Sequence, residues 1–379
     1  MTSVARWLLV LACVLAWTSP PASAQNACKT CAGSGLAPCR PCAKQRCTNE
    51  HEVLFCSLAR CKACGGTQLA PCKCAAPAKL DLAAKRAALE AWRTKLPAEV
   101  AEFMGREIAV AESAHFVLVW DVPKVDHKRG TDLHGALHLY LDRLEEFHTR
   151  FRADTDSKES DFSSKTLAMV WAREADQEKA SPKWTLQPSN TESKLMGRAP
   201  VFSVFYDKGH MHEEYELHQA LVHQASHCLL SNVHNGIWSG NIKGGWVDEG
   251  LAHWYENELF DGVRHYCYVE ADTLVDFKFG KWEAGVRRAL DGGKLPSIFT
   301  FTGLHTTEMT PPQRMFAWAL VDYLLRGPKK CYGAFARAAK EKKPFGEACQ
   351  AILGKSAIEL ERDWHAWLAE NYSAEPSKR

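Results

Sequence analysis

The chain has 379 residues, 46% hydrophobic and 24% charged, and this ordinary globular composition excludes a wholly disordered or collagen-like protein. Its 47 basic and 45 acidic residues leave a net charge of +2, so no global field favours nucleic acid or an anionic membrane. Cysteine is the outlier, because ten of the 15 cysteines lie between Cys28 and Cys74, which indicates a separate small module.

The N-terminus has the pattern of a secretory signal peptide. An apolar run over residues 7–17 follows the basic Arg6, and an Ala-Ser-Ala sequence ending at Ala24 provides a small-residue cleavage site. The run is too short to span a bilayer, and no later segment has 18 uninterrupted apolar residues. We therefore expect removal of residues 1–24, no transmembrane segment, and a secreted, periplasmic or cell-envelope protein whose cysteines are paired or metal-bound.

Residues 25–76 contain an internal repeat. Residues 28–40 (CKTCAGSGLAPCR) and 61–73 (CKACGGTQLAPCK) are identical at eight of 13 positions. Each copy has a C-x-x-C pair followed by glycine, and two thiolates at that spacing can bind one tetrahedral Zn²⁺. The pattern predicts up to two zinc ions held by Cys28, Cys31, Cys39, Cys42, Cys61, Cys64, Cys72 and Cys74.

This block resembles the cysteine-rich zinc domain of DnaJ-type chaperones, whose repeats read C-x-x-C-x-G-x-G. Residues 28–35 fit the full motif, whereas the second copy has Gln68 in place of the second glycine. A disulfide framework is the alternative, because the ten cysteines are even in number and the chain is expected to be exported.

Residues 77–112 are expected to form a helical linker. Residues 80–104 are rich in Ala, Leu, Lys and Glu with apolar spacing near 3.6, and Pro97 is expected to split them into two helices. Nothing in this segment indicates chemistry of its own.

Residues 113–372 predict a large α+β domain, followed by a polar tail at 373–379. The expected strands cover residues 115–122, 165–171 and 200–206. The expected helices cover residues 132–151, 213–230, 313–325, 331–339 and 357–368, with a further helix opening near Gly245. The expected disulfides in this domain join Cys228 to Cys267 and Cys331 to Cys349.

The informative residues lie on two consecutive helices. His223 and His227 are four residues apart, so their imidazoles share one helix face and can bind one metal ion. The segment GWVDEGLAHWYE, which begins 18 residues after His227, can present Glu249 to the same ion. Two histidines and a glutamate form a catalytic zinc set with an open fourth position. The alternatives are helix histidines without metal and a helix-start carboxylate.

Here the sequence looks like a gluzincin, a metallopeptidase of the thermolysin-like MA clan. WVDEGLAHWYE resembles the W-L-N-E-G-x-A segment of that group's aminopeptidases, and the resemblance covers roughly residues 113–370. It implies a small mixed sheet with residues 200–206 as the edge strand, active-site helices and a helical C-terminal subdomain. It also implies that His223, His227 and Glu249 bind zinc, and His253 is a candidate partner around them.

Gln224 departs from the family pattern. Gluzincins have their general-base glutamate at this position, and an amide cannot accept the proton near neutral pH. We therefore expect a weak or inactive peptidase that binds a peptide or protein ligand. The alternatives are an active metallopeptidase that uses Glu213, Glu216 or Glu256 as base, and a structural cell-envelope protein without metal in the large domain.

Overall fold

The computed structural model describes residues 28–41, 53–74, 76–128, 130–206, 211, 213–263 and 281–375. The expected signal peptide, Cys42 and Cys267 therefore lie outside the described residues. The architecture is α+β, as predicted, with helices packed on a six-stranded mixed sheet. None of the described helices combines the length and the hydropathy that a membrane span requires.

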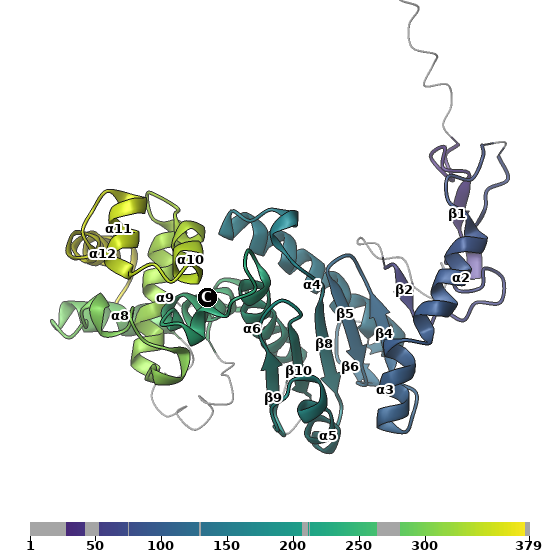
Figure 1. Cartoon of the computed structure of the whole chain (residues 1–379), viewed down its shortest axis with the longest axis horizontal. Coiled ribbons are helices and arrows are strands. Elements are labelled where there is room, and N and C mark those ends of the chain that lie inside the picture. Colours follow the sequence, from purple (N-terminus) through teal and green to yellow (C-terminus); the bar gives the residue numbers. More distant parts are fainter. Residues whose placement is uncertain are drawn as a thin grey trace, which may run out of the picture.

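The central sheet has the strand order β2-β4-β5-β8-β10-β9 (Figure 1). Its strands are β2 (Phe55–Cys56), β4 (Ala109–Glu112), β5 (Phe116–Trp120), β8 (Thr166–Trp171), β9 (Glu192–Leu195) and β10 (Val201–Phe205). β5, β8 and β10 are parallel, and the other pairings are antiparallel. The prediction that residues 200–206 form the edge strand is wrong, because β9 covers β10. β9 was not predicted because its sequence, ESKL, lacks the β-branched and aromatic residues that mark strands.

Helices cover both faces of this sheet. The helices on one face are α4 (Leu133–Thr155) and α6 (Glu214–Asn232), and those on the other are α2 (Leu82–Arg93), α3 (Leu96–Met104) and α5 (Glu174–Trp184). Along β5, Leu118 packs in the core of the first face and Val119 in that of the second. The break between α2 and α3 precedes Pro97, as predicted, since proline fits the first turn of a helix.

The cysteine repeat forms a small unit at the end of the molecule opposite the C-terminal helices (Figure 1). The two Leu-Ala-Pro copies pair with each other as antiparallel strands β1 (Leu36–Pro38) and β3 (Leu69–Pro71). Gln68 has φ 61° and its repeat equivalent Gly35 has φ 71°. The second copy therefore keeps the left-handed turn of the first without its glycine.

A further two-stranded sheet joins β6 (Lys124–Val125) to β7 (Thr131–Asp132).

Helix α7 (Gly245–Phe260) lies between α6 and the C-terminal helices. Those helices are α8 (Trp282–Asp291), α9 (Pro311–Arg326), α10 (Tyr332–Lys340), α11 (Phe345–Leu353) and α12 (Ala357–Asn371). A Cβ on Gly250 would stand 2.8 Å from the carbonyl oxygen of Ala317 in α9. Glycine after Glu249 therefore permits the close packing of α7 on α9.

None of the described cysteines is part of a disulfide. The predicted bond between Cys331 and Cys349 is therefore wrong, and Cys228 is a thiol rather than half of a bond to Cys267. Burial raises the pKa of Cys228 and of Cys349 to about 12. Neither side chain therefore readily supplies the thiolate that disulfide formation requires.

Candidate metal centre

The two predicted histidines and the predicted glutamate converge in the structure. His223 and His227 lie on one face of α6 with their Nε2 atoms 3.0 Å apart. Glu249 comes from α7, and the three ligand atoms lie within 4.8 Å of one another. All three side chains are fully buried. Nitrogen ligands of a tetrahedral zinc ion are about 3.3 Å apart at ordinary Zn–N lengths, so this spacing suits zinc.

Carboxylates hold both imidazoles from behind. His223 Nδ1 lies 2.6 Å from Glu256 Oε1, and His227 Nδ1 lies 2.8 Å from Asp248 Oδ1. A ring nitrogen that faces a carboxylate carries the proton, which leaves the Nε2 lone pair as the ligand atom. Asp248 was not predicted to take part, although it directly precedes Glu249 in the motif.

These supporting carboxylates are themselves fixed. Trp238 Nε1 donates to Asp248 Oδ2 at 2.7 Å, and the Thr306 hydroxyl donates to the same oxygen at 3.3 Å. Gln219 Nε2 donates to Glu256 Oε2 at 3.0 Å. The orientation of both histidines is therefore set by a buried hydrogen-bond network that spans α6 and α7.

Glu249 gives the strongest indication of a cation site. Neither of its carboxylate oxygens has a hydrogen-bond partner among the described residues. Arg314 Nη1 and His253 Nε2 lie at 3.7 and 3.5 Å from Oε2. Burial raises the pKa of Glu249, but nearby positive charge, chiefly that of the Arg314 guanidinium, outweighs burial and brings the pKa to about 2. An ionised, buried carboxylate without hydrogen bonds is costly, so a divalent cation fits this position.

The predicted surrounding residue, His253, is buried beside this centre. Its Nε2 faces Glu249, and its Nδ1 lies 3.2 Å from Glu256 Oε1. His253 thus contacts one expected ligand and the carboxylate that orients another. This is the arrangement of a residue that supports a metal centre from outside.

Gln224 has an acidic neighbour that the sequence did not reveal. Its Nε2 donates to Glu192 Oε2 at 2.8 Å, and both side chains are buried. Glu192 lies 32 positions earlier in the chain, on the edge strand β9. A carboxylate therefore stands directly beside the position where gluzincins have their base.

The three alternative bases occupy other roles. Glu213 and Glu216 form a capping box at the start of α6. Seven residues separate Glu216 from His223, which is about 10 Å along a helix axis. Glu256 contacts the Nδ1 side of His223, away from the ligand atom. None of the three thus faces the point where the two Nε2 atoms converge.

The cysteine module brings its thiols together in a crossed arrangement. Cys28 Sγ lies 3.7 Å from Cys72 Sγ, and Cys31 Sγ lies 3.4 Å from Cys74 Sγ. Tetrahedral zinc–sulfur geometry gives sulfur separations of about 3.8 Å. The opening pair of the first copy therefore meets the closing pair of the second copy. Hydrogen bonds from the backbone at Thr30 and Cys31 lower the pKa of Cys28 to about 6, which favours the thiolate.

A second group in the module joins Cys39, Cys61 and Cys64. Cys39 Sγ lies 3.8 Å from Cys61 Sγ. The expected fourth ligand, Cys42, lies outside the described residues. The donor sets of both groups, and of the α6–α7 centre, are compatible with zinc.

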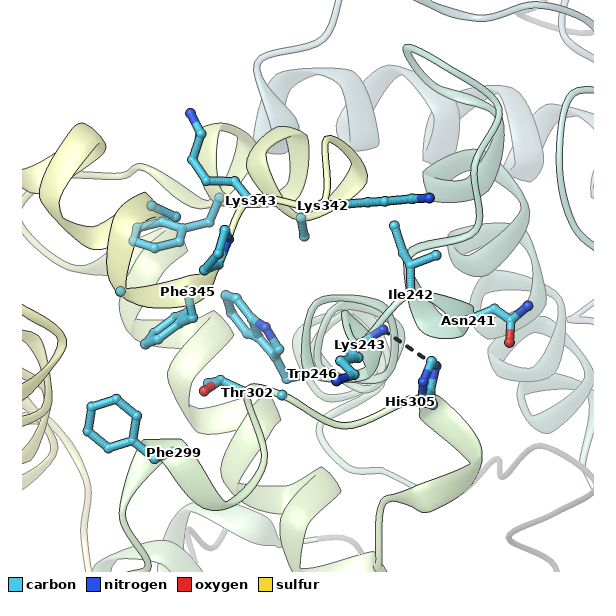
Figure 2. Close-up of a pocket in the computed structure, with 16 residues that line it drawn as sticks. Asn241, Ile242, Lys243, Trp246, Phe299, Thr302, His305, Lys342, Lys343 and Phe345 are labelled. Carbon is cyan, nitrogen blue, oxygen red and sulfur yellow. Dashed lines mark hydrogen bonds between the residues drawn. The ribbon is translucent and has the colours of Figure 1, made fainter.

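A cavity of about 750 Å³ lies near the start of α7 but is not lined by the expected zinc ligands (Figure 2). Trp246 and Phe345 form part of its wall, with ring centroids 5.4 Å apart, and Lys342 and Lys343 lie at its rim. Aromatic walls beside ammonium groups suit a ligand with an apolar body and a negative charge.

No protein-family profile matches the chain, and no curated protein shows significant sequence similarity to it. The geometry of the centre is therefore the basis for assigning a function.

Proposed function

We propose that this chain is an exported, zinc-binding protein of the gluzincin type that binds a peptide or protein ligand and hydrolyses peptides weakly or not at all. Zinc would be held by His223, His227 and Glu249, and the fold would be that of an MA-clan peptidase with a DnaJ-like cysteine-rich zinc module. Export rests on the N-terminal signal-peptide pattern.

One observation carries the zinc part of this proposal. Two imidazoles with carboxylate-bound Nδ1 atoms converge on a buried, ionised Glu249 whose oxygens lack hydrogen-bond partners among the described residues. Bound there, zinc would polarise a carbonyl oxygen or lower the pKa of a bound water towards about 7.

The loss of hydrolysis is argued from Gln224. Its amide donates a hydrogen bond to Glu192, so its nitrogen is already engaged and its oxygen is a weak base. General-base catalysis contributes about 10²–10⁴-fold to such reactions, and this contribution would be missing.

Ligand binding is argued from the sheet edge. Among the described strands, β9 pairs with β10 and lies at the end of the sheet, where a peptide would add as a further strand. Glu192 ties this strand to Gln224, the neighbour of His223, so a peptide added to β9 would run past the centre.

The proximity of Glu192 favours a second candidate function, an active zinc hydrolase. In that case the Glu192 carboxylate would take the proton in place of a residue at position 224, and Gln224 would orient it. The 2.8 Å contact between the two side chains supports this alternative over one that uses Glu213, Glu216 or Glu256.

The zinc content of the full chain tests whether the α6–α7 centre binds zinc. We expect His223→Ala/His227→Ala to hold one zinc per chain fewer than the wild type, by elemental analysis after dialysis against metal-free buffer. The control, His365→Ala on the remote helix α12, should keep the wild-type content. Equal zinc in all three proteins would mean that the α6–α7 centre binds no zinc and would favour the structural cell-envelope protein.

Exchanging the side chains of Gln224 and Glu192 tests the proposed loss of hydrolysis. Gln224→Glu/Glu192→Gln transposes amide and carboxylate and keeps their hydrogen bond, whereas Gln224→Glu alone would place two carboxylates in contact. We expect the exchange to raise chelator-sensitive cleavage of casein by about 10²–10⁴-fold over the wild type. The control is Gln224→Leu, which should bind zinc without cleaving.

The second candidate gives the opposite pattern. An active wild type whose cleavage disappears in Glu192→Gln would identify Glu192 as the base and overturn the binding proposal.

A further inference from the structure

A second pair of histidines with four-residue spacing lies at the start of α4. His134 and His138 are the second and sixth residues of that helix, and their Nε2 atoms are 3.1 Å apart. Facing them is Cys56, the last residue of the short strand β2. Cys56 lies between the two cysteine repeats in the sequence, outside both repeated motifs.

The thiol and the two imidazoles converge on one point. Cys56 Sγ lies 3.7 Å from His134 Nε2 and 3.4 Å from His138 Nε2. For zinc at ordinary Zn–S and Zn–N lengths, tetrahedral geometry places sulfur about 3.6 Å from nitrogen and the nitrogens about 3.3 Å apart. The three observed separations agree with these values to a few tenths of an ångström.

We propose that Cys56, His134 and His138 bind a structural Zn²⁺ ion that fastens the cysteine module to the large domain. Thiolate and imidazole are the ligands that zinc prefers, and the set contains no carboxylate that would favour magnesium or calcium. Cys56 and His138 are each about 1% exposed, so the ion would be shielded from solvent.

Three protein ligands leave the fourth position of a tetrahedral zinc ion open, and this site differs from a catalytic centre in the residue that follows its first histidine. Gly135 follows His134, so this helix has no polar side chain at the position that Gln224 occupies beside His223.

The location gives the ion a mechanical role. Strand β2 pairs with β4 through two residue pairs, and the flanking Leu54 and Ser57 each add one backbone hydrogen bond to β4. A pairing of this length is weak by itself. A zinc bond from Cys56 to α4, 78 positions away in the sequence, would anchor the β2 segment to a helix of the main core.

The test measures zinc in the full chain. We expect Cys56→Ala and His134→Ala each to lose one zinc per chain, and the double variant Cys56→Ala/His134→Ala to lose the same single zinc rather than two. His134 is only half-buried, so its variant serves if Cys56→Ala does not fold. The control is Cys349→Ala, which removes a buried thiol that belongs to none of the metal-ligand groups named above and should keep all zinc.

Cobalt substitution provides a readout that a packing role would not change. After replacement of zinc by Co²⁺, Cys56→Ala should lose one thiolate-to-cobalt charge-transfer contribution, and Cys349→Ala should lose none. Adding His223→Ala/His227→Ala to Cys56→Ala should remove a further zinc, which separates this site from the α6–α7 centre. Unchanged zinc content in folded Cys56→Ala and His134→Ala would overturn the proposal.

Discussion

Two clusters in this protein have the same residue composition, but they differ in whether the protein hydrogen-bonds the carboxylate. Each contains two histidines and a glutamate, His223, His227 and Glu249 in one and His115, His148 and Glu145 in the other. In the second cluster His115 donates from its backbone nitrogen to one oxygen of Glu145 at 2.9 Å, and its Nδ1 lies 2.5 Å from the other oxygen. The Glu145 carboxylate is thus satisfied by the protein itself, whereas the oxygens of Glu249 accept no such bond among the described residues.

The two clusters also differ in how their histidine rings are arranged. His115 and His148 stack face to face, with ring centroids 3.8 Å apart and ring planes 13° from parallel. His223 and His227 are inclined by 71°, and their Nε2 atoms approach one point. Residue types therefore do not identify a metal centre. Its indications are convergent lone pairs and a buried carboxylate that the protein leaves without donors.

The largest expected difference between the clusters is in zinc-dependent stability. Free zinc at about a thousand times the dissociation constant should stabilise the large domain by about 4 kcal/mol per site. The contribution of the α6–α7 centre should vanish in His223→Ala/His227→Ala and persist in His115→Ala/His148→Ala. Urea unfolding followed by tryptophan fluorescence measures this, because residues 28–76 contain no tryptophan. Equal zinc dependence in the two variants would contradict the assignment.

The next largest effect is a pH dependence of stability from the cluster of His115, His148 and Glu145. Burial raises the pKa of Glu145, but hydrogen bonds from His115 and Ser113 outweigh it and bring the pKa to about 2. This stabilisation is present above the ordinary value of 4.5 and is lost as the pH falls towards 2. Burial lowers the pKa of His115, but the carboxylates of Glu145 and Glu159 have the larger effect and raise this pKa above 6.5. The stabilisation from His115 is therefore complete below pH 6.5 and is lost as the pH rises through the raised pKa.

The glutamine variant isolates this pair. We expect Glu145→Gln to lower the free energy of unfolding by about 3 kcal/mol between pH 4.5 and 6.5, with or without zinc. Urea titrations at pH 3, 5.5 and 8.5 measure the profile of both proteins. A loss that appears only with zinc would show that this cluster also binds metal.

The smallest effect concerns the carboxylate behind His223. Glu256→Gln replaces an acceptor of His223 Nδ1 with an amide and should weaken zinc binding about 10–100-fold, or about 1.4–2.7 kcal/mol. Competition with a chromophoric chelator measures the affinity. Glu146→Gln, an exposed change on α4, should leave it unaltered. An unchanged affinity in Glu256→Gln would mean that this carboxylate does not orient the ligand.

Local patterns predicted much of the fold. The spacing of apolar residues indicated α6, and the observed helix extends two residues beyond the expected end at 230. The spacing of His223 and His227 put both on one helix face without any tertiary information. Strand β9 escaped prediction because ESKL has no strand signal, and it forms because β10 offers it an edge. Because β9 was not predicted, the hydrogen bond between Gln224 and Glu192 was not predicted either.

The sequence by itself determined what neighbours along the chain can decide: the cysteine repeat, the paired histidines and the amide at position 224. Only the tertiary structure decided which distant groups complete these patterns. Asp248 and Glu256 became the partners of the histidines through the packing of α7 on α6, and Cys56 met His134 through the pairing of β2 with β4. Helical periodicity acts over a few residues, whereas contacts between elements depend on the burial of whole faces against one another.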